Sequence, residues 1–259
     1  MDPTERFSDR AAAYARGRPG YPARMAPTVL AELGLGEDAV VADLGSGTGL
    51  SSEPFLRAGL RVIGIEPNAA MRAGSERHLA AEPRFRTLPG TAEATGLPPG
   101  SVDLVIAAQA FHWFDVVAAR AEALRILRRP ARAAVIWNER LATGSPFAEG
   151  YERLLRESCP DYPAIHGRQG DPARLAAFFG GQGWRRLTFA NPSELDFDLL
   201  VDRLQSASYT PAPGSAGHAA LLARLERLFA LNERGGHVTM EHETRVHLGS
   251  LAEPSEPSE

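Results

Sequence analysis

The 259-residue chain is 44% hydrophobic, which is enough for one sizeable core or for one domain with a substantial insertion. Its formal net charge is -4, and acidic and basic residues are interspersed, so no basic stripe indicates a nucleic-acid partner. No apolar run is long enough to span a bilayer, and the single cysteine, Cys159, fits a reducing compartment, so we expect a cytoplasmic protein with no membrane partner.

The first 140 residues alternate between helical and strand-like segments. Residues 3–16 have a helical pattern that ends at Gly17, Pro19 and Pro22, and an amphipathic helix follows over 24–34. Strands are predicted at 39–44, 60–66, 85–90, 101–109 and 131–139, and helices at 50–59, 68–80 and 116–128. This alternation predicts right-handed βαβ units, and therefore a Rossmann-like, doubly wound, mostly parallel sheet with helices on both faces.

The second half contains more helix. Helices are predicted at 146–158, 171–179, 196–209 and 218–235, and strands at 184–190 and 237–249. The late strand would be antiparallel, which makes seven strands in all. We expect one domain over 1–251, with a helical N-terminal lid (1–22), a cofactor-binding core (38–140), a helical cap (141–235) and late strands to 248, followed by a disordered tail (252–259). The apolar stripe of 218–235 fits core packing or a dimer contact, so monomer and homodimer both stay open.

The segment VVADLGSGTGL, residues 40–50, places three glycines directly after the first predicted strand. Glycine allows a positive φ and a close approach of the backbone to a ligand, and the amides of the next helix can face an anion. Glu66 ends the second predicted strand, about twenty residues past the first glycine, where a carboxylate can accept from both ribose hydroxyls. These features fit NAD and an adenosyl-sulfonium ligand equally well.

Three further details separate the two ligands. The turn is G-x-G-x-G (Gly45, Gly47, Gly49), and not the G-x-G-x-x-G of dinucleotide sites. Asp43 precedes it, and an acid suits an α-ammonium group better than a pyrophosphate. The third detail is the stretch GTAEATGLPPGSVDLV, which places Ala92 after the third predicted strand and another strand shortly after it. Over 38–140 the chain resembles the class I S-adenosylmethionine-dependent methyltransferases.

The resemblance implies an S-adenosylmethionine site at the carboxyl ends of the strands. The glycine turn would cradle the methionine part and the ribose, Glu66 would hold the ribose hydroxyls, and the loops after the later strands would reach the adenine and the sulfonium. The implied cofactor residues are Tyr14, Arg18, Asp43, Gly45, Ser46, Gly47, Thr48, Gly49, Glu66, Pro67, Met71, Thr91, Ala92, Glu93, Gln109, Ala110 and Phe111.

The stretch QAFHWFD, residues 109–115, gathers aromatic side chains after the fourth strand. Together with AYARGRPGYP near the N-terminus, it resembles the small-molecule branch that includes trans-aconitate methyltransferase-like proteins. By that resemblance Tyr14, Arg18 and Tyr21 would form a lid near the methionine carboxylate, which an arginine fork suits. The implied substrate pocket consists of Tyr21, His112, Trp113, Phe114, Trp137 and Asn138.

The sequence therefore predicts in-line methyl transfer to an oxygen, nitrogen or carbon nucleophile of a small molecule. His112 is the candidate base, with Glu139 next, and pocket lining is the alternative role of His112. The spacing of His237, His242 and His247 predicts three surface histidines and no metal site. An NAD(P)-dependent oxidoreductase and a non-catalytic S-adenosylmethionine-binding protein are the alternative functions.

Overall fold

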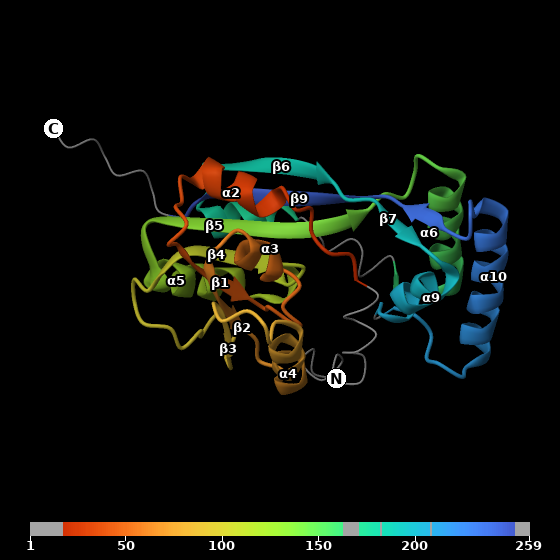
Figure 1. The fold of residues 1–259 in the computed structure, drawn as a ribbon, viewed down its shortest axis with the longest axis horizontal. Helices are drawn as coiled ribbons and strands as arrows, with labels where there is room; N and C mark the ends of the chain where they lie inside the picture. Colours follow the sequence, from red (N-terminus) through yellow and green to blue (C-terminus); the bar gives the residue numbers. More distant parts are fainter. Residues whose placement is uncertain (1–17, 163–170, 182, 208, 252–259) are drawn as a thin grey trace.

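The computed structural model describes residues 18–162, 171–181, 183–207 and 209–251 (Figure 1). The helix expected over 3–16, Tyr14 of the expected lid, and the tail 252–259 lie outside these residues. Within the described ranges, no helix is both long enough and apolar enough to cross a membrane.

A seven-stranded sheet forms the centre of the molecule, with the order β3-β2-β1-β4-β5-β9-β6. The strands are β1 (Val40–Leu44), β2 (Arg61–Ile65), β3 (Phe85–Leu88), β4 (Val102–Ala108), β5 (Leu127–Arg140), β6 (Trp184–Ala190) and β9 (His242–Ser250). Strands β1 to β5 pair in parallel, whereas β9 is antiparallel to both β5 and β6. The prediction of a mostly parallel seven-stranded sheet with an antiparallel late strand is confirmed.

Helices cover both faces of this sheet, as the doubly wound pattern predicts (Figure 1). On one face α2 (Met25–Leu33) and α3 (Glu53–Arg57) pack in a core cluster with alternate strand residues such as Val41 and Leu104. On the other face α5 (Val116–Ile126) and α8 (Pro172–Phe179) pack on Ala42 and Val105. Strands buried on both faces have near-continuous apolar sequences, which is why the strand predictions in this half hold.

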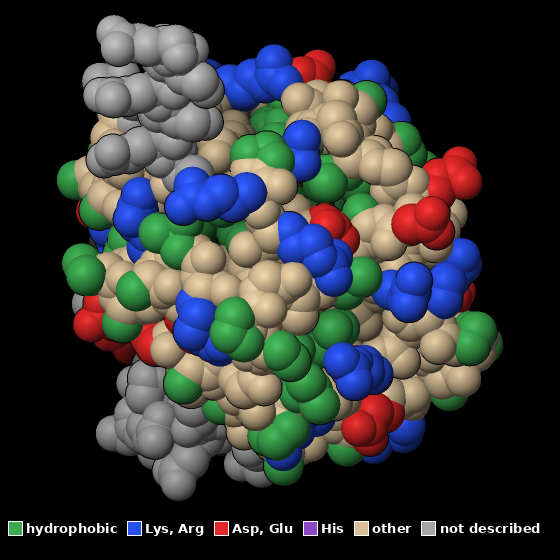
Figure 2. Space-filling view, turned by 90° about the vertical axis from the view of Figure 1, so that its left-hand side faces the viewer, with side chains coloured by type: hydrophobic (Ala, Val, Ile, Leu, Met, Phe, Trp, Pro, Cys, Tyr) green, Lys and Arg blue, Asp and Glu red, His purple; other side chains and the backbone are tan. Residues whose placement is uncertain are grey.

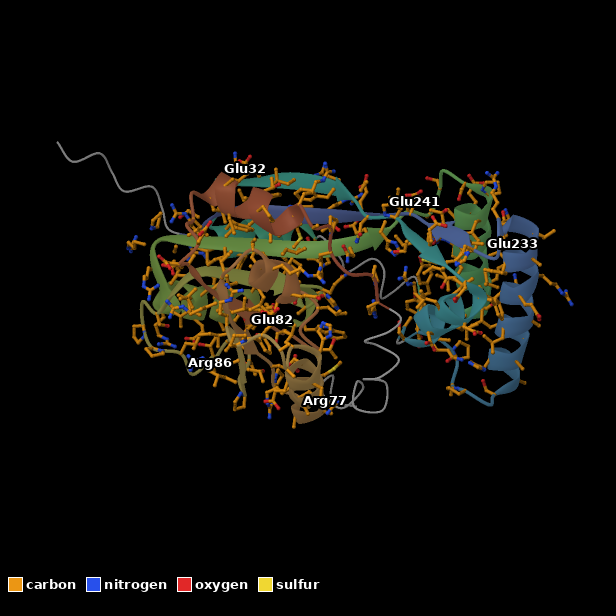
Figure 3. The ribbon with its side chains drawn as sticks, in the orientation of Figure 1. Glu32, Arg77, Glu82, Arg86, Glu233 and Glu241 are labelled. Carbon is orange, nitrogen blue, oxygen red and sulfur yellow. The ribbon has the colours of Figure 1, made fainter. Side chains whose placement is uncertain are left out.

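A helical cap lies beyond the carboxyl ends of the parallel strands, on the right of Figure 1. It consists of α6 (Pro146–Ser158), α9 (Phe197–Gln205), α10 (Ala216–Asn232) and a two-stranded sheet of β7 (Ser193–Leu195) and β8 (Val238–Met240). These elements share a core cluster of their own, which includes Phe147, Leu200 and Leu225. Figure 3 shows their side chains filling the space between the helices, with Glu233 at the outside.

Two predictions about this half are wrong. The cap is not continuous over 141–235, because α8 and β6 return to the central sheet between α6 and β7. The single strand predicted over 237–249 is two strands, since β8 pairs with β7 in the cap whereas β9 joins the main sheet. Strand β7 has only three residues, which is too short for an alternating pattern to identify it.

One network connects the cap to the end of β5. Arg140, the last residue of β5, pairs with Glu152 of α6 and donates to the Tyr162 hydroxyl at 2.9 Å, and Tyr162 donates to Glu152 at 2.6 Å. The Arg140 guanidinium also lies over the Tyr151 ring, 5.1 Å from its centroid.

The end of the molecule opposite to the cap is seen in Figure 2. It carries basic, acidic and apolar side chains side by side and no continuous basic stripe.

Candidate active site

The glycine turn has the backbone conformation that its sequence predicts. Gly45, Gly47 and Gly49 have φ values of 69°, 55° and 85°, in the left-handed region that favours glycine. A Cβ on Gly45 would lie 2.6 Å from the Ala110 Cβ, and one on Gly49 would lie 2.8 Å from Leu79 Cδ1. A Cβ on Gly47 would meet nothing within 4 Å. The outer two glycines therefore permit close packing, and the middle one faces open space where a ligand can approach.

Glu66 lies directly beside this turn, at the end of β2. Its Oε2 accepts from the Gly47 amide at 3.0 Å and its Oε1 from the Asn68 amide at 2.9 Å. The side chain is 8% exposed, and burial raises the pKa of the carboxyl. Each carboxylate oxygen has a second lone pair, so both can still accept from a ligand hydroxyl.

Asp43 lies beneath the turn and not on the wall of a pocket. It is fully buried, and its Oδ2 accepts from the Ser51 hydroxyl at 2.6 Å and the Ser52 hydroxyl at 2.8 Å. Its Oδ1 has no partner among the described residues, and burial raises the pKa of Asp43 to about 6. The predicted direct contact with an α-ammonium group does not fit a side chain with no exposed surface. Asp43 instead orients Ser51, which does line a pocket.

A pocket opens above the glycine turn and is bounded by four parts of the chain. Its floor is the turn itself, one wall is the end of β4 with Gln109, a second wall is Asn138 of β5, and its roof is the segment before α2. The lining residues are Arg18, Pro19, Tyr21, Gly45, Ser46, Gly47, Thr48, Leu50, Ser51, Ala108, Gln109 and Asn138. The structure thus brings the predicted lid residues Arg18 and Tyr21 over the predicted cofactor turn.

The residues expected around adenine lie at the ends of β2 and β3. Met71 is buried in α4 (Ala69–His78), where its amide donates to the Asn68 cap at 3.0 Å, and Pro67 precedes this helix. Ala92 is buried, whereas Thr91 is exposed and pairs through its backbone with Ala94. The exposed Thr91 hydroxyl is therefore free of the core and can face a ligand.

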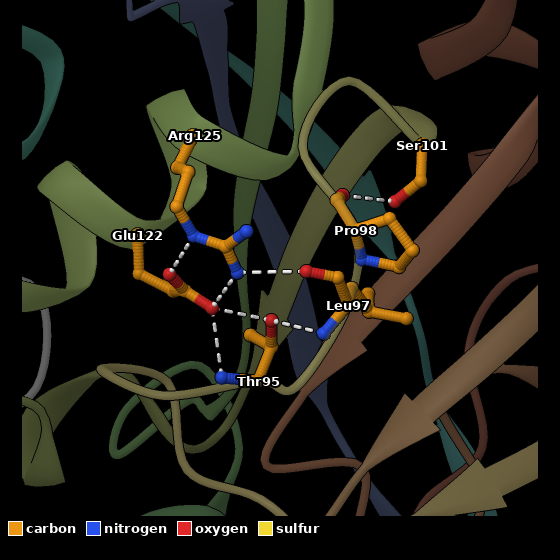
Figure 4. Close-up of polar contacts among 6 residues, drawn as sticks. All are labelled: Thr95, Leu97, Pro98, Ser101, Glu122 and Arg125. Atoms are coloured by element: carbon orange, nitrogen blue, oxygen red, sulfur yellow. Dashed lines mark hydrogen bonds and ion pairs between the residues drawn. The ribbon is translucent and has the colours of Figure 1, made fainter.

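A buried polar network fixes the loop that carries Thr91 and Ala92 (Figure 4). Glu122 of α5 accepts from the Thr95 amide at 2.8 Å and the Thr95 hydroxyl at 2.5 Å. Arg125 donates to Glu122 at 2.7 Å and to the Leu97 carbonyl at 2.8 Å. The hydrogen bond from Arg125 lowers the pKa of Glu122 to about 2. The loop after β3 is therefore held on α5 by charge-assisted hydrogen bonds.

The aromatic side chains of the turn after β4 divide between the core and the surface. Gln109 has a φ of 57°, and its side chain donates to the Asn138 carbonyl at 3.0 Å. Phe111 starts a short 3-10 helix, is 2% exposed and packs against Trp137 and Phe178. Trp113 is 44% exposed. The turn thus holds one aromatic side chain in the core and presents another at the surface.

The structure corrects the predicted roles of Phe111 and Trp137. Both belong to the core cluster on the α5 and α8 face, and Trp137 is only 1% exposed. Neighbouring side chains on a strand point to opposite faces, so Trp137 cannot line the pocket when Asn138 does. Ala110 is likewise buried against Gly45, where it shapes the turn from below.

The predicted bases differ in their surroundings. Glu139 forms an ion pair with Arg245 of β9, on the strand face opposite to Asn138, so the structure does not bring it to the pocket. His112 is partly buried, and its ring centroid lies 4.7 Å from that of Trp113. His112, Trp113 and Phe114 lie after β4 near the pocket but are not among the residues that line it.

The histidines near the C-terminus also differ from the prediction. His242 and His247 are buried on β9, not at the surface, and burial lowers the pKa of each to about 4. His237 precedes β8 and is exposed. No group of metal-ligating side chains occurs in the part of the chain that the structure describes.

Arg174, which the sequence did not single out, and Glu93, which it placed at the cofactor, hold the aromatic turn in place. Arg174 of α8 donates to the Phe114 carbonyl at 2.7 Å and lies over the Phe111 ring, 5.8 Å from its centroid. Glu93, predicted to touch the cofactor, accepts from the Asp115 amide at 2.9 Å. Arg174 follows the turn by about sixty residues with no motif around it, so only the tertiary structure reveals it.

The fold and the site together define a Rossmann-like methyltransferase. A family model described as a methyltransferase domain (type 11) matches residues 42–135. The uncharacterized methyltransferase Rv3342 of Mycobacterium tuberculosis is 37% identical over 231 residues, which cover 86% of this chain and 85% of that protein. A solved structure of a putative type II methyltransferase from Anaeromyxobacter dehalogenans is 25% identical and superimposes with a TM-score of 0.62, covering 90% of this chain and 98% of that one.

A shorter match extends to yeast. The probable S-adenosylmethionine-dependent methyltransferase CRG1 of Saccharomyces cerevisiae is 33% identical over 111 residues, which cover 40% of this chain and 36% of that protein. The chain belongs to the class I S-adenosylmethionine-dependent methyltransferases, and it is an enzyme of that activity.

Proposed function

We propose that this methyltransferase transfers a methyl group in line from S-adenosylmethionine to an oxygen, nitrogen or carbon nucleophile of a small organic molecule. The observation that carries the proposal is the pocket over the glycine turn, whose roof, Arg18 to Tyr21, comes from before α2. A site roofed by the chain itself suits an acceptor that can be surrounded. It does not suit a reacting group that lies within a large folded partner.

The residues around the turn fit the cofactor. Gly47 leaves open space above the backbone, and Glu66 retains accepting capacity beside it. Ser46 and Thr48 line the pocket as residues of the turn, while their hydroxyl oxygens are buried within the protein. We assign the methionine part to the turn and to Arg18, the ribose to Glu66, and the adenine to Pro67, Met71, Thr91 and Ala92.

The bound cofactor supplies an activated methyl group on a sulfonium, so the protein has to align the acceptor and exclude water. Gln109 and Asn138 line the pocket where the strands end, and Gln109 is held there by its hydrogen bond to the Asn138 carbonyl. Arg174 and Glu93 hold the backbone of the aromatic turn, which fixes His112 and Phe114 at the edge of the site. His112, beside the pocket, is the candidate base for an acceptor that has to lose a proton.

Calorimetry with S-adenosylhomocysteine and NAD tests the cofactor assignment. Binding of S-adenosylhomocysteine without binding of NAD is expected, and the reverse pattern would replace the proposal with an oxidoreductase. A screen of small molecules for S-adenosylhomocysteine release then identifies the acceptor. An absence of turnover with any acceptor class, despite cofactor binding, would favour a non-catalytic binding protein.

His112→Ala tests the base. With an acceptor in hand, single-turnover rates are expected to fall between about a hundredfold and ten thousandfold, the range for losing a general base. Trp113→Ala is the matched control, because its side chain is next to His112 but carries no basic group. A loss of less than about tenfold in His112→Ala would make His112 part of the pocket lining only.

A further inference from the structure

Asn138 forms hydrogen bonds with three other parts of the chain at the edge of the cofactor pocket. Its side-chain amide donates to the Gly20 carbonyl at 3.0 Å and to the Pro19 carbonyl at 3.3 Å. Its side-chain oxygen accepts from the Thr244 hydroxyl at 2.5 Å and from the Asn191 amide at 3.3 Å. The residue is 8% exposed, and Thr244 is fully buried.

Two further sets of hydrogen bonds extend this network. Asn191 connects it to the pocket roof, and Gln109 connects it to the pocket wall. The Asn191 side chain donates to the Gly20 carbonyl at 2.8 Å, while the Asn191 backbone amide is bound to the His242 carbonyl at 2.8 Å. The backbone carbonyl of Asn138 accepts from the Gln109 side chain at 3.0 Å. Strand β9, the end of β4 and the segment before α2 thus meet at one residue of β5, Asn138.

We propose that Asn138, oriented by Thr244 and supported by Asn191, is a positioning residue that holds residues 18–21 closed over the cofactor. These residues are called the roof segment below. The inference deepens the proposed function, since it rests on the assignment of this pocket to S-adenosylmethionine. It assigns Asn138 a role in retaining the cofactor, beyond lining the pocket.

The chemistry of the site requires an amide at position 138. Two carbonyl oxygens of the roof segment need donors, while a hydroxyl and an amide from β9 and Asn191 need an acceptor. Only asparagine and glutamine present both kinds of group on one planar end, and glutamine is one methylene too long for a buried site. A carboxylate of the same shape would direct negative charge at both roof carbonyls, so it would repel the roof segment.

The test compares Asn138→Asp with the wild type in two assays. Hydrogen–deuterium exchange of peptides that span residues 18–24 is measured without ligand, and the affinity for S-adenosylhomocysteine is measured by calorimetry. We expect faster exchange in these peptides and binding weaker by about tenfold or more, as for the loss of two hydrogen bonds. Asn232→Asp in the cap, where the side chain donates to the Leu228 carbonyl, is the matched control and should change neither quantity.

Two variants of Thr244 test the same proposal if Asn138→Asp does not fold. Thr244→Val removes the hydroxyl that orients Asn138, and Thr244→Ser retains it. We expect Thr244→Val to weaken binding and speed exchange of residues 18–24, and Thr244→Ser to restore both. Equal behaviour of the two variants, or unchanged exchange and affinity within twofold in Asn138→Asp, would overturn the proposal. If the wild type itself fails to bind S-adenosylhomocysteine, the cofactor assignment is wrong, and the exchange assay still decides whether Asn138 holds the roof segment.

Discussion

Asp43→Asn should gain stability relative to the wild type as the pH rises, although the residue lies in the centre of the site. The carboxyl is fully buried, and its pKa is raised from 3.8 to about 6. One pH unit between the folded and unfolded pKa values corresponds to about 1.4 kcal/mol, so the ionised group costs about 3 kcal/mol of folding free energy at neutral pH. An amide has the shape of the neutral acid and cannot ionise, and its oxygen can still accept from Ser51 and Ser52.

The sign of the pH dependence follows from the raised pKa. The unfolded chain loses its proton near pH 4 and the folded chain near pH 6, so the free energy of unfolding falls as the pH rises between these values. Urea denaturation should therefore show the stability of Asp43→Asn relative to the wild type to rise by about 2 kcal/mol between pH 4.5 and pH 7.5.

Asp115→Asn, an exposed helix cap that an amide can replace, is the control for the substitution and should change stability by less than about 0.5 kcal/mol. The affinity for S-adenosylhomocysteine should fall in Asp43→Asn, because a negative charge beneath the turn is lost. The quantity to compare is the free energy of unfolding of Asp43→Asn minus that of the wild type. If this difference is no larger at pH 7.5 than at pH 4.5, the reasoning is refuted.

Three other variants test the surroundings of the site. Glu66→Gln should weaken S-adenosylhomocysteine binding by about 1.5–3 kcal/mol in calorimetry, the range for hydrogen bonds to a charged group, and an unchanged affinity would contradict its assignment to the ribose. Gly45→Ala should lower the free energy of unfolding by about 1–3 kcal/mol, since its Cβ would lie 2.6 Å from the Ala110 Cβ at a φ of 69°; a variant as stable as the wild type in urea would show that the turn can relax. Arg125 lowers the pKa of Glu122 from 4.5 to about 2, so the stability that Glu122 contributes is present above pH 4.5 and is lost as the pH falls toward 2. The difference in stability between the wild type and Glu122→Gln should shrink over that window, and a constant difference would exclude a role of the charge.

The cofactor half of the fold could be predicted because its signals are local. The run before Gly45 is apolar on both faces, as a central parallel strand must be, and each glycine of the turn has the positive φ that its spacing suggests. Glu66 lies at the end of β2, where the sequence predicts it. In this half every strand pair except β1–β4 joins strands that follow one another along the chain, so local pattern and tertiary structure largely agree.

The rest depended on information that a single sequence does not contain. Trp137 and Asn138 are adjacent, and only the register of β5 decides which of them faces the pocket. The alternating residues after His237 continue without interruption, yet the chain passes from the cap sheet to the main sheet at Glu241. Arg174 acts through backbone carbonyls, which leave no trace in the residue types around it.

The route of the chain through the cap limits how acceptor preference can be changed by recombination. The cap has its own apolar core, but the chain enters it twice, first from β5 to α6 and again from β6 through β7 to β8, with α8 and β6 between the two visits. A chimera that exchanges one continuous segment would combine half of one core with half of another and leave mismatched side chains in contact. A transplant that preserves the packing must carry both segments together, while the sheet and its glycine turn stay with the recipient.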